Sequence, residues 1–241
     1  MNKILVPGKF KRKIRVLLGT PTYEGIKTKC VAAREDFMVK KMVGSRFTIH
    51  SMLNGGTYLD SNREEISQAA IDDNYDYLFF VDSDMIFRPD VLDRLYDRHK
   101  DVVGAIYSLR SGKNHGPAIY NYRKDKGDFT RYPYWPINKF LKVDGIGTGL
   151  LLIKIEALKK IPAPRFAYLE CVTPDKKGNR RRVGEDLSFC IRCKENGIKV
   201  YADGTIWVGH LGEKIWSYKD FQVAEIIAKE GFKGMDCLTV G

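Results

Sequence analysis

Asp76-Tyr-Leu-Phe-Phe-Val-Asp82-Ser-Asp84-Met-Ile-Phe87 is the stretch that decides the fold of this 241-residue chain. Its centre, Leu78 to Val81, is a continuous apolar run, which is typical of a strand covered on both faces of a parallel sheet. Two carboxylates follow within three residues, where the strand ends. Because ligands of open α/β sheets bind just outside the carboxyl ends of the strands, we expect a binding site at Asp82 and Asp84.

These two aspartates, with Ser83 between them, form a D-x-D triplet that suits a divalent metal ion. Mg²⁺ and Mn²⁺ prefer carboxylate and phosphate oxygens and keep water in their remaining positions, so the pair could hold such an ion against a diphosphate. The alternative is an ordinary polar turn, because Asp and Ser are common turn residues. The triplet alone leaves both interpretations open.

Length and composition indicate an ordinary soluble globular protein. A chain of 241 residues with 44% hydrophobic and 29% charged residues can form one large domain or two small ones, with a full core. No stretch approaches the ~20 apolar residues of a membrane span, and the N-terminus has no long apolar segment of a signal peptide. The five cysteines are scattered, which favours reduced thiols and a cytoplasmic location.

The chain is strongly basic, with 41 Lys and Arg against 30 Asp and Glu and a net charge of +11. Such an excess favours a polyanionic partner, which could be a nucleic acid, an acidic membrane surface or a phosphorylated substrate. The charge says nothing about the fold.

The pattern of elements up to residue 107 is βαβαβαβ, which predicts a mostly parallel sheet flanked by helices. The capping-box pattern Ser61-Asn-Arg-Glu64 predicts the start of the helix before the central strand. The other elements are expected as strands at 14–19, 46–52, 78–81 and 101–107 and as helices at 28–41 and 89–99.

Three further features lie in the second half of the chain. Gly147-Thr148-Gly149 precedes an apolar strand, which indicates either close approach of the backbone to a ligand or a plain bulge. Glu185 and Asp186 lie at the start of a helix that ends at Asn196. Acidic residues in a first helical turn usually only interact favourably with the helix dipole. His210 ends an apolar run at 205–212, and a last helix is expected at about 215–230.

The order of Asp82-Ser83-Asp84, Gly147–Gly149, Glu185-Asp186 and His210 resembles that of GT-A fold, nucleotide-sugar-dependent glycosyltransferases similar to family 2. The resemblance runs from Ile14 to about Gly212. It implies a single α/β, Rossmann-like GT-A domain over residues 1–241, with a mostly parallel central sheet flanked by helices. It also implies that residues 1–110 bind the nucleotide and that residues 111–241 bind the acceptor and carry catalysis.

The same resemblance assigns the donor-binding residues. It implies that the turn after the first strand holds the nucleotide base, which here means Thr20, Pro21, Tyr23 and Glu24. Arg63 matches an arginine that neutralises the diphosphate or contacts the base. The donor is expected to be a UDP-sugar.

The metal and sugar sites follow from the later motifs. The resemblance implies that Asp84 and His210 bind Mn²⁺ or Mg²⁺, that Asp82 and Ser83 lie at the ribose and that Asp82 also faces the metal. Neutral imidazole is an acceptable ligand for such ions. The Gly147–Gly149 loop, with Thr148 at its centre, would line the sugar.

Asp186, with Glu185 beside it, matches the catalytic carboxylate of inverting members of the family. Such a base takes the proton of the acceptor hydroxyl, and a helix N-terminus is expected to lower the pKa of the carboxyl. If the enzyme retains configuration, Asp186 would instead bind the donor or the acceptor. A glycoside hydrolase pair is excluded, because adjacent residues at a helix start diverge by about 100° and cannot flank one bond.

The acceptor is predicted from charge. Cations and aromatic side chains alternate over 120–135, and Lys176, Lys177 and Arg180–Arg182 precede the proposed base. Such a surface suits DNA, and we expect a hydroxymethylated pyrimidine as acceptor, as in bacteriophage DNA modification. A glycan or lipid-linked glycan acceptor, a nucleotidyltransferase and a non-catalytic nucleic-acid-binding module remain alternatives. Cys190 and Cys193, a C-x-x-C pair without a second pair, are expected in the core and not on zinc.

Overall fold

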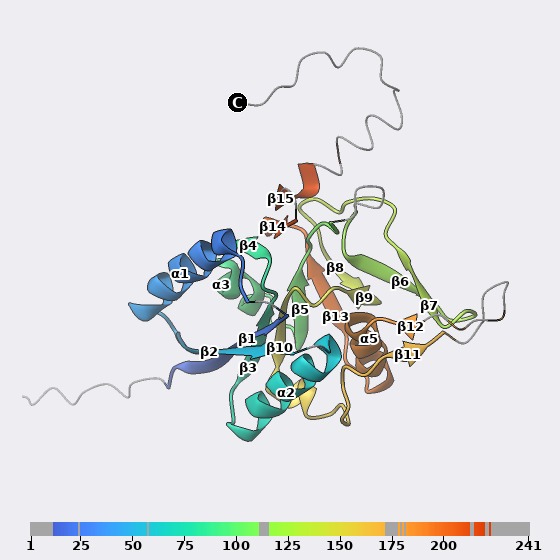
Figure 1. Cartoon of the computed structure of the whole chain (residues 1–241), viewed down its shortest axis with the longest axis horizontal. Helices are drawn as coiled ribbons and strands as arrows, with labels where there is room; N and C mark the ends of the chain where they lie inside the picture. The colour runs from blue at the N-terminus through green and yellow to red at the C-terminus, as the bar shows by residue number, and fades with distance from the viewer. Residues whose placement is uncertain are drawn as a thin grey trace, which may run out of the picture.

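The computed structural model describes residues 12–23, 25–56, 58–110, 116–171, 178, 180, 182–212, 215–219 and 222. Its centre is a seven-stranded sheet (Figure 1). In order across the sheet, the strands are β2 (Phe47–Gly55), β1 (Ile14–Thr22), β3 (Tyr77–Val81), β10 (Leu150–Lys154), β5 (Val102–Ala105), β13 (Val200–Asp203) and β8 (Phe140–Val143).

The predicted α/β class and mostly parallel sheet are confirmed. Strands β2, β1, β3, β5 and β13 run in one direction, whereas β10 and β8 run against them. The sequence did not predict that β10 lies between β3 and β5. A glycine on β5 makes room for it, because a Cβ at Gly104 would lie 3.0 Å from the carbonyl oxygen of Leu150.

Helices cover both faces of the sheet (Figure 1). The helices α1 (Thr28–Met42) and α3 (Val91–Tyr96) pack against Phe79 and Val81 on one face. The helices α2 (Leu59–Asp72), α4 (Ile155–Leu158) and α5 (Glu185–Glu195) pack against Leu78 and Phe80 on the other. The continuous apolar run of β3 is therefore explained by burial on both faces. Among the described residues, no helix combines the length and the apolar character that crossing a bilayer requires.

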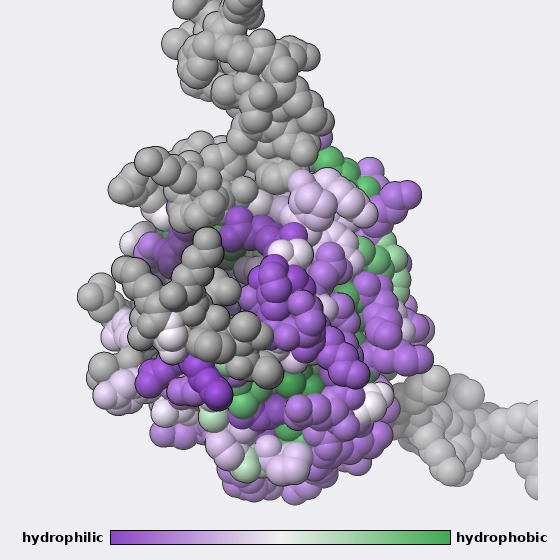
Figure 2. Space-filling view, turned by 90° about the vertical axis from the view of Figure 1, so that its right-hand side faces the viewer, coloured by the Kyte–Doolittle hydropathy of each residue, from purple (hydrophilic) through white to green (hydrophobic). Residues whose placement is uncertain are grey.

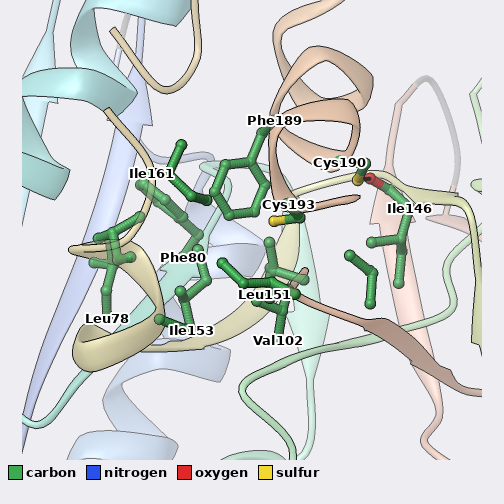
Figure 3. Close-up of a cluster of buried hydrophobic side chains, with 14 of the residues drawn as sticks. Leu78, Phe80, Val102, Ile146, Leu151, Ile153, Ile161, Phe189, Cys190 and Cys193 are labelled. Carbon is green, nitrogen blue, oxygen red and sulfur yellow. Dashed lines mark hydrogen bonds between the residues drawn. The ribbon is translucent and has the colours of Figure 1, made fainter. Parts of the chain in front are cut away.

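The cluster on the α2 and α5 face is shown in Figure 3. Phe166 stacks on Phe189 with ring centroids 4.7 Å apart. Cys190 and Cys193 are fully buried in the same cluster, and the Cys190 thiol lies 3.7 Å from the carbonyl oxygen of Ile146. Their predicted place in the core is confirmed.

Smaller sheets extend the ends of the central one. One joins β4 (Met85–Phe87) to β14 (Val208–Leu211) and β15 (Ile215–Trp216). A second contains β7 (Asp128–Arg131), β6 (Ile119–Arg123) and β9 (Gly145–Ile146), and the third pairs β11 (Leu169–Glu170) with β12 (Arg182–Val183). The pairing of β14 with β4 brings a late part of the chain next to the end of β3.

Two predictions of local structure are wrong. The start of the expected helix at 215–230 is wrong, because Ile215–Trp216 forms β15, which pairs with β14; residues 218, 219 and 222 are helical, and residues 220, 221 and 223–230 lie outside the described residues. The capping box does not form, because α2 already begins at Leu59 and no side chain caps it. Glu64 instead accepts hydrogen bonds from the backbone N–H of Arg165 at 2.6 Å and of Phe166 at 3.3 Å, so its carboxylate fixes another segment.

Candidate active site

Asp82 and Asp84 lie in the turn between β3 and β4. The backbone N–H of Asp82 donates to the carbonyl oxygen of Gly149 at 2.9 Å, so the predicted glycine loop adjoins the triplet. Ser83 is half-buried, and its carbonyl oxygen accepts a hydrogen bond from the N–H of Lys27 at 3.2 Å. The turn is thus held by backbone bonds from both sides.

His210 is brought to Asp84 by pairing between β14 and β4. His210 is opposite Met85, and the N–H of Leu211 donates to the carbonyl oxygen of Asp84 at 2.8 Å. Nε2 of His210 lies 3.4 Å from Oδ1 of Asp84. On its other side, Nδ1 lies 2.7 Å from the carbonyl oxygen of Ser108, which can only accept, so we assign the proton to Nδ1. In the neutral ring, Nε2 then presents a lone pair toward Asp84.

Asp84 is 8% exposed and is surrounded by cations. Nη1 of Arg110 lies 2.9 Å from Oδ2 of Asp84. Burial acts to raise the pKa of Asp84, but the hydrogen bond and charge that His210 supplies in its protonated form, with the charges of Arg110 and Lys27, outweigh it and lower this pKa. Asp84 is therefore ionised at neutral pH.

Asp84 and His210 fit a divalent ion, because an ionised carboxylate and an imidazole lone pair converge at one point. The described residues contain no group of three His, Cys, Asp or Glu side chains that could hold a metal. An ion at Asp84 would therefore take its remaining ligands from water and from substrate oxygens, as Mg²⁺ commonly does.

Arg63 links the end of β3 to the start of α5. Its side chain is 2% exposed, Nη2 donates to Oδ1 of Asp82 at 2.9 Å, and Nε lies 3.5 Å from Oε1 of Glu185. The guanidinium also lies over the ring of Phe80, 5.2 Å from its centroid. Burial lowers the pKa of Arg63, but the two carboxylates outweigh it and raise this pKa. The side chain thus links the D-x-D turn, through Asp82, to the start of α5, through Glu185. Its contact with a donor stays a prediction.

Asp186 is half-buried in the first turn of α5, and its Oδ1 accepts a hydrogen bond from the N–H of Leu187 at 2.7 Å. Burial and the charge of Glu185 raise the pKa of Asp186 to about 7, against the opposing effects of Leu187 and Arg63. The prediction that the helix dipole lowers this pKa is wrong, because the dipole effect is smaller than those of burial and a neighbouring carboxylate. A pKa near 7 is well matched to a general base.

The backbone at Gly147 closely approaches Tyr107, and the backbone at Gly149 closely approaches Met85 and Tyr107. A Cβ at Gly147 would lie 2.1 Å from the hydroxyl oxygen of Tyr107, and one at Gly149 would lie 2.4 Å from Cε of Met85. The N–H of Gly149 donates to the same Tyr107 oxygen at 3.3 Å. Between the glycines, Thr148 is 1% exposed, and its hydroxyl has no partner among the described residues.

Tyr107 is a site residue that sequence analysis missed. It is buried, and burial with the charges of Asp82 and Asp186 raises its pKa well above the ordinary tyrosine value. The ring therefore lies within electrostatic reach of both motifs and stays protonated. Its position at the end of the predicted strand 101–107 was the available signal, since strand ends carry the site in this class of sheet.

The turn predicted to hold the nucleotide base is partly buried. Thr20 and Pro21 are buried, and Nη1 of Arg34 donates to the Thr20 hydroxyl at 2.6 Å. Tyr23 is 63% exposed, and Glu24 lies outside the described residues. Burial, followed by the charges of Glu185, Asp60, Tyr23 and Asp186, raises the pKa of Tyr168.

A surface cavity of about 460 Å³, counted with the space open to solvent, adjoins the start of α5. Its lining includes Tyr120 and Phe129 from β6 and β7, Arg182 from β12, and Gly184 and Leu187, which flank the two acidic residues. Figure 2 shows this side of the molecule, where hydrophilic residues cover most of the coloured surface and small hydrophobic areas lie between them.

Part of the predicted DNA-binding surface is engaged within the protein. Arg123 is paired with Asp128 at 2.5 Å, and Tyr122 packs on Phe129 with ring centroids 5.1 Å apart. Tyr134 is 55% exposed. In the basic loop, Arg180 and Arg182 are exposed, whereas Lys176, Lys177 and Arg181 lie outside the described residues.

No protein-family model matches the sequence, and no curated protein matches it. The crystal structure of A197 from STIV aligns with a TM-score of 0.56 at 22% identity, over 86% of this chain and 91% of that chain. The crystal structure of GalNAc-T7 with UDP, GalNAc and Mn²⁺ aligns with a TM-score of 0.53 at 10% identity, over 84% of this chain and 44% of that chain. At such identities a likeness shows the fold alone. The chain therefore has the GT-A fold of glycosyltransferases.

Proposed function

We propose that this protein is a metal-dependent glycosyltransferase that moves a sugar from a nucleotide-sugar, specifically a UDP-sugar, to a hydroxyl group of an acceptor. The observation that carries the proposal is the joining of Asp84 and His210 to the acidic start of α5, through Arg63 and Asp82, within a GT-A fold. The UDP and Mn²⁺ in the GalNAc-T7 structure support the choice of donor and metal.

The donor would bind across the end of β3. Asp84 and His210 would hold Mn²⁺ or Mg²⁺, which when bound neutralises the charge on the departing diphosphate. Asp82 would contact the ribose while Arg63 fixes its carboxylate. The Thr20–Tyr23 turn would hold the base, and the Gly147–Gly149 loop would line the sugar.

Asp186 would act as the base of an inverting transfer. The hydrogen bond from Leu187 to Oδ1 orients the carboxylate, and Oδ2 would take the proton of the acceptor hydroxyl. As that proton leaves, the acceptor oxygen bonds to the anomeric carbon, and the bond from this carbon to the diphosphate oxygen breaks. Glu185 keeps Asp186 basic through its charge and is therefore a positioning residue in this proposal.

The proposed acceptor is a hydroxymethylated pyrimidine base in DNA, and the net charge of +11 is the observation that favours it. A glycan is the second candidate. It is favoured by the cavity beside α5, because Tyr120 and Phe129 line it and aromatic rings stack on sugar faces as well as on bases. Either acceptor would bring its hydroxyl to Asp186 from this cavity.

The test is transfer from a panel of UDP-sugars in the presence of Mn²⁺, with and without DNA that contains hydroxymethylated pyrimidines. A hexose-sized mass gain on the nucleoside would support both reaction and acceptor. UDP release without stimulation by DNA would favour a glycan acceptor. Asp84→Ala and Asp186→Asn are the matched inactive controls. Release of pyrophosphate from a nucleoside triphosphate, with no use of any sugar donor, would refute the proposal in favour of nucleotidyl transfer.

A further inference from the structure

Two cationic side chains that have no role in the donor assignments above lie close together beside Asp84. Lys27 lies at the start of α1, and Arg110 follows β5. The Nζ atom of Lys27 and the Nη1 atom of Arg110 each donate to the carbonyl oxygen of Leu211, both at 3.3 Å. The backbone N–H of Lys27 donates in addition to Ser83, so this cation is tied to the D-x-D turn.

The arrangement has an excess of positive charge. Two cations that bind one oxygen atom lie close together and repel each other, and Asp84 supplies a single negative charge to both. No side chain caps α1 at Lys27, and the first turn of this helix has no acidic residue. Because a helix N-terminus also favours anions, a further anion at this point would be stabilised from three sides.

Arg110 forms an ion pair with Asp84, the carboxylate proposed to bind the metal. Its Nη1 atom lies 2.9 Å from Oδ2 of Asp84, while Oδ1 faces His210. The arginine side chain is 43% exposed, and such ion pairs are weak, so a doubly charged ion can displace it.

We propose that Arg110 occupies Asp84 in the metal-free protein, and that a divalent ion releases it to bind a diphosphate together with Lys27. The metal and the diphosphate then bind cooperatively, because the first ligand frees a cation for the second. This inference rests on the proposed function only in taking the diphosphate from a nucleotide-sugar. The same chemistry would recognise free pyrophosphate or a nucleoside triphosphate.

The first experiment measures binding of Mn²⁺ alone, from the electron paramagnetic resonance signal of the free ion. Arg110→Ala should bind Mn²⁺ severalfold more tightly than the wild type, because Asp84 has lost its competing cation. Arg88→Ala is the matched control, since Arg88 is exposed and faces Asp90. Unchanged or weaker Mn²⁺ binding by Arg110→Ala would overturn the proposal.

The second experiment measures binding of pyrophosphate and of UDP by calorimetry at saturating Mn²⁺. Lys27→Ala and Arg110→Ala should each weaken both anions by about tenfold to a hundredfold, the usual loss for a charged hydrogen bond. Lys29→Ala, an exposed change on the same helix, should have no such effect. Tighter metal and weaker anion binding in one variant cannot result from misfolding, so Arg110→Ala provides its own control.

The outcomes separate this inference from the proposed function. If Lys27→Ala and Arg110→Ala bind pyrophosphate and UDP with normal affinity, the proposal that these two cations bind the diphosphate is wrong, even if the wild type transfers sugar. Pyrophosphate binding that depends on Lys27 and Arg110, without use of any sugar donor, would support the pair and refute the glycosyltransferase.

Discussion

Replacing Asp186 by Asn should make the protein more stable and less active at the same time. The pKa of this carboxyl is raised from an ordinary value of 3.8 to about 7, so ionising it in the folded protein is unfavourable. The folded state therefore binds more protons than the unfolded state between these two values, and stability falls as the pH rises through this window. The loss is complete above about pH 7.

The expected gain in the stability of Asp186→Asn can be worked out from the raised pKa of Asp186. The interval from 3.8 to about 7 corresponds to at most ~4 kcal/mol of unfolding free energy at pH 8, and part of it is shared with Glu185. The neutral amide of Asn avoids this penalty. The difference between variant and wild type should therefore be largest at pH 8 and should vanish near pH 4.

Urea unfolding at the two pH values measures this difference without any substrate. Glu195→Gln, an exposed change at the other end of α5, should alter stability little at either pH. Turnover of a UDP-sugar should fall by about a hundredfold to ten-thousandfold in Asp186→Asn, the usual contribution of a general base. If Asp186→Asn is less stable than the wild type at pH 8, the raised pKa of Asp186 is refuted. If the variant keeps normal turnover, the role of Asp186 as general base is refuted.

Three further predictions concern the surrounding residues. Asp84→Ala should keep the fold but lose Mn²⁺ binding by electron paramagnetic resonance, and retained affinity would remove Asp84 from the metal site. Arg63→Met should lower the unfolding free energy in urea by about 3–5 kcal/mol, because two carboxylates lose their buried cation; a neutral effect would show that they do not need it. Gly147→Ala should cost about 1–3 kcal/mol because its methyl group meets the Tyr107 hydroxyl, and Tyr107→Phe should relieve part of that loss in the double variant.

The sequence predicted the features that depend on local pattern. The apolar run before Asp82 and the glycine-bounded strand 150–154 gave the central strands, because burial on both faces leaves a continuous apolar sequence. The partnership of Asp84 with His210 agrees with the family resemblance. Its physical cause, the pairing of β14 with β4, is a long-range contact that no local pattern encodes.

What sequence analysis missed depends on packing. The ordinary βαβ rule makes β3 and β5 neighbours, and only the later strand β10 separates them. The pattern at Ser61 to Glu64 matched a cap, but the carboxylate found stronger partners 101 residues away, on Arg165. The pKa of Asp186 depends on burial and on a neighbouring charge in three dimensions, which the helix position alone could not give.

The antiparallel strand β10 has a consequence for synthesis of the protein. While the ribosome has made only the first 110 residues, the strand that separates and joins β3 and β5 is missing, so β3 has one unpaired edge and β5 has two. These two strands can be joined only after Lys154 has been synthesised, and until then their unpaired edges favour aggregation. A fragment cut at residue 110 should therefore not fold alone, because the strand at the centre of its sheet is encoded beyond its end.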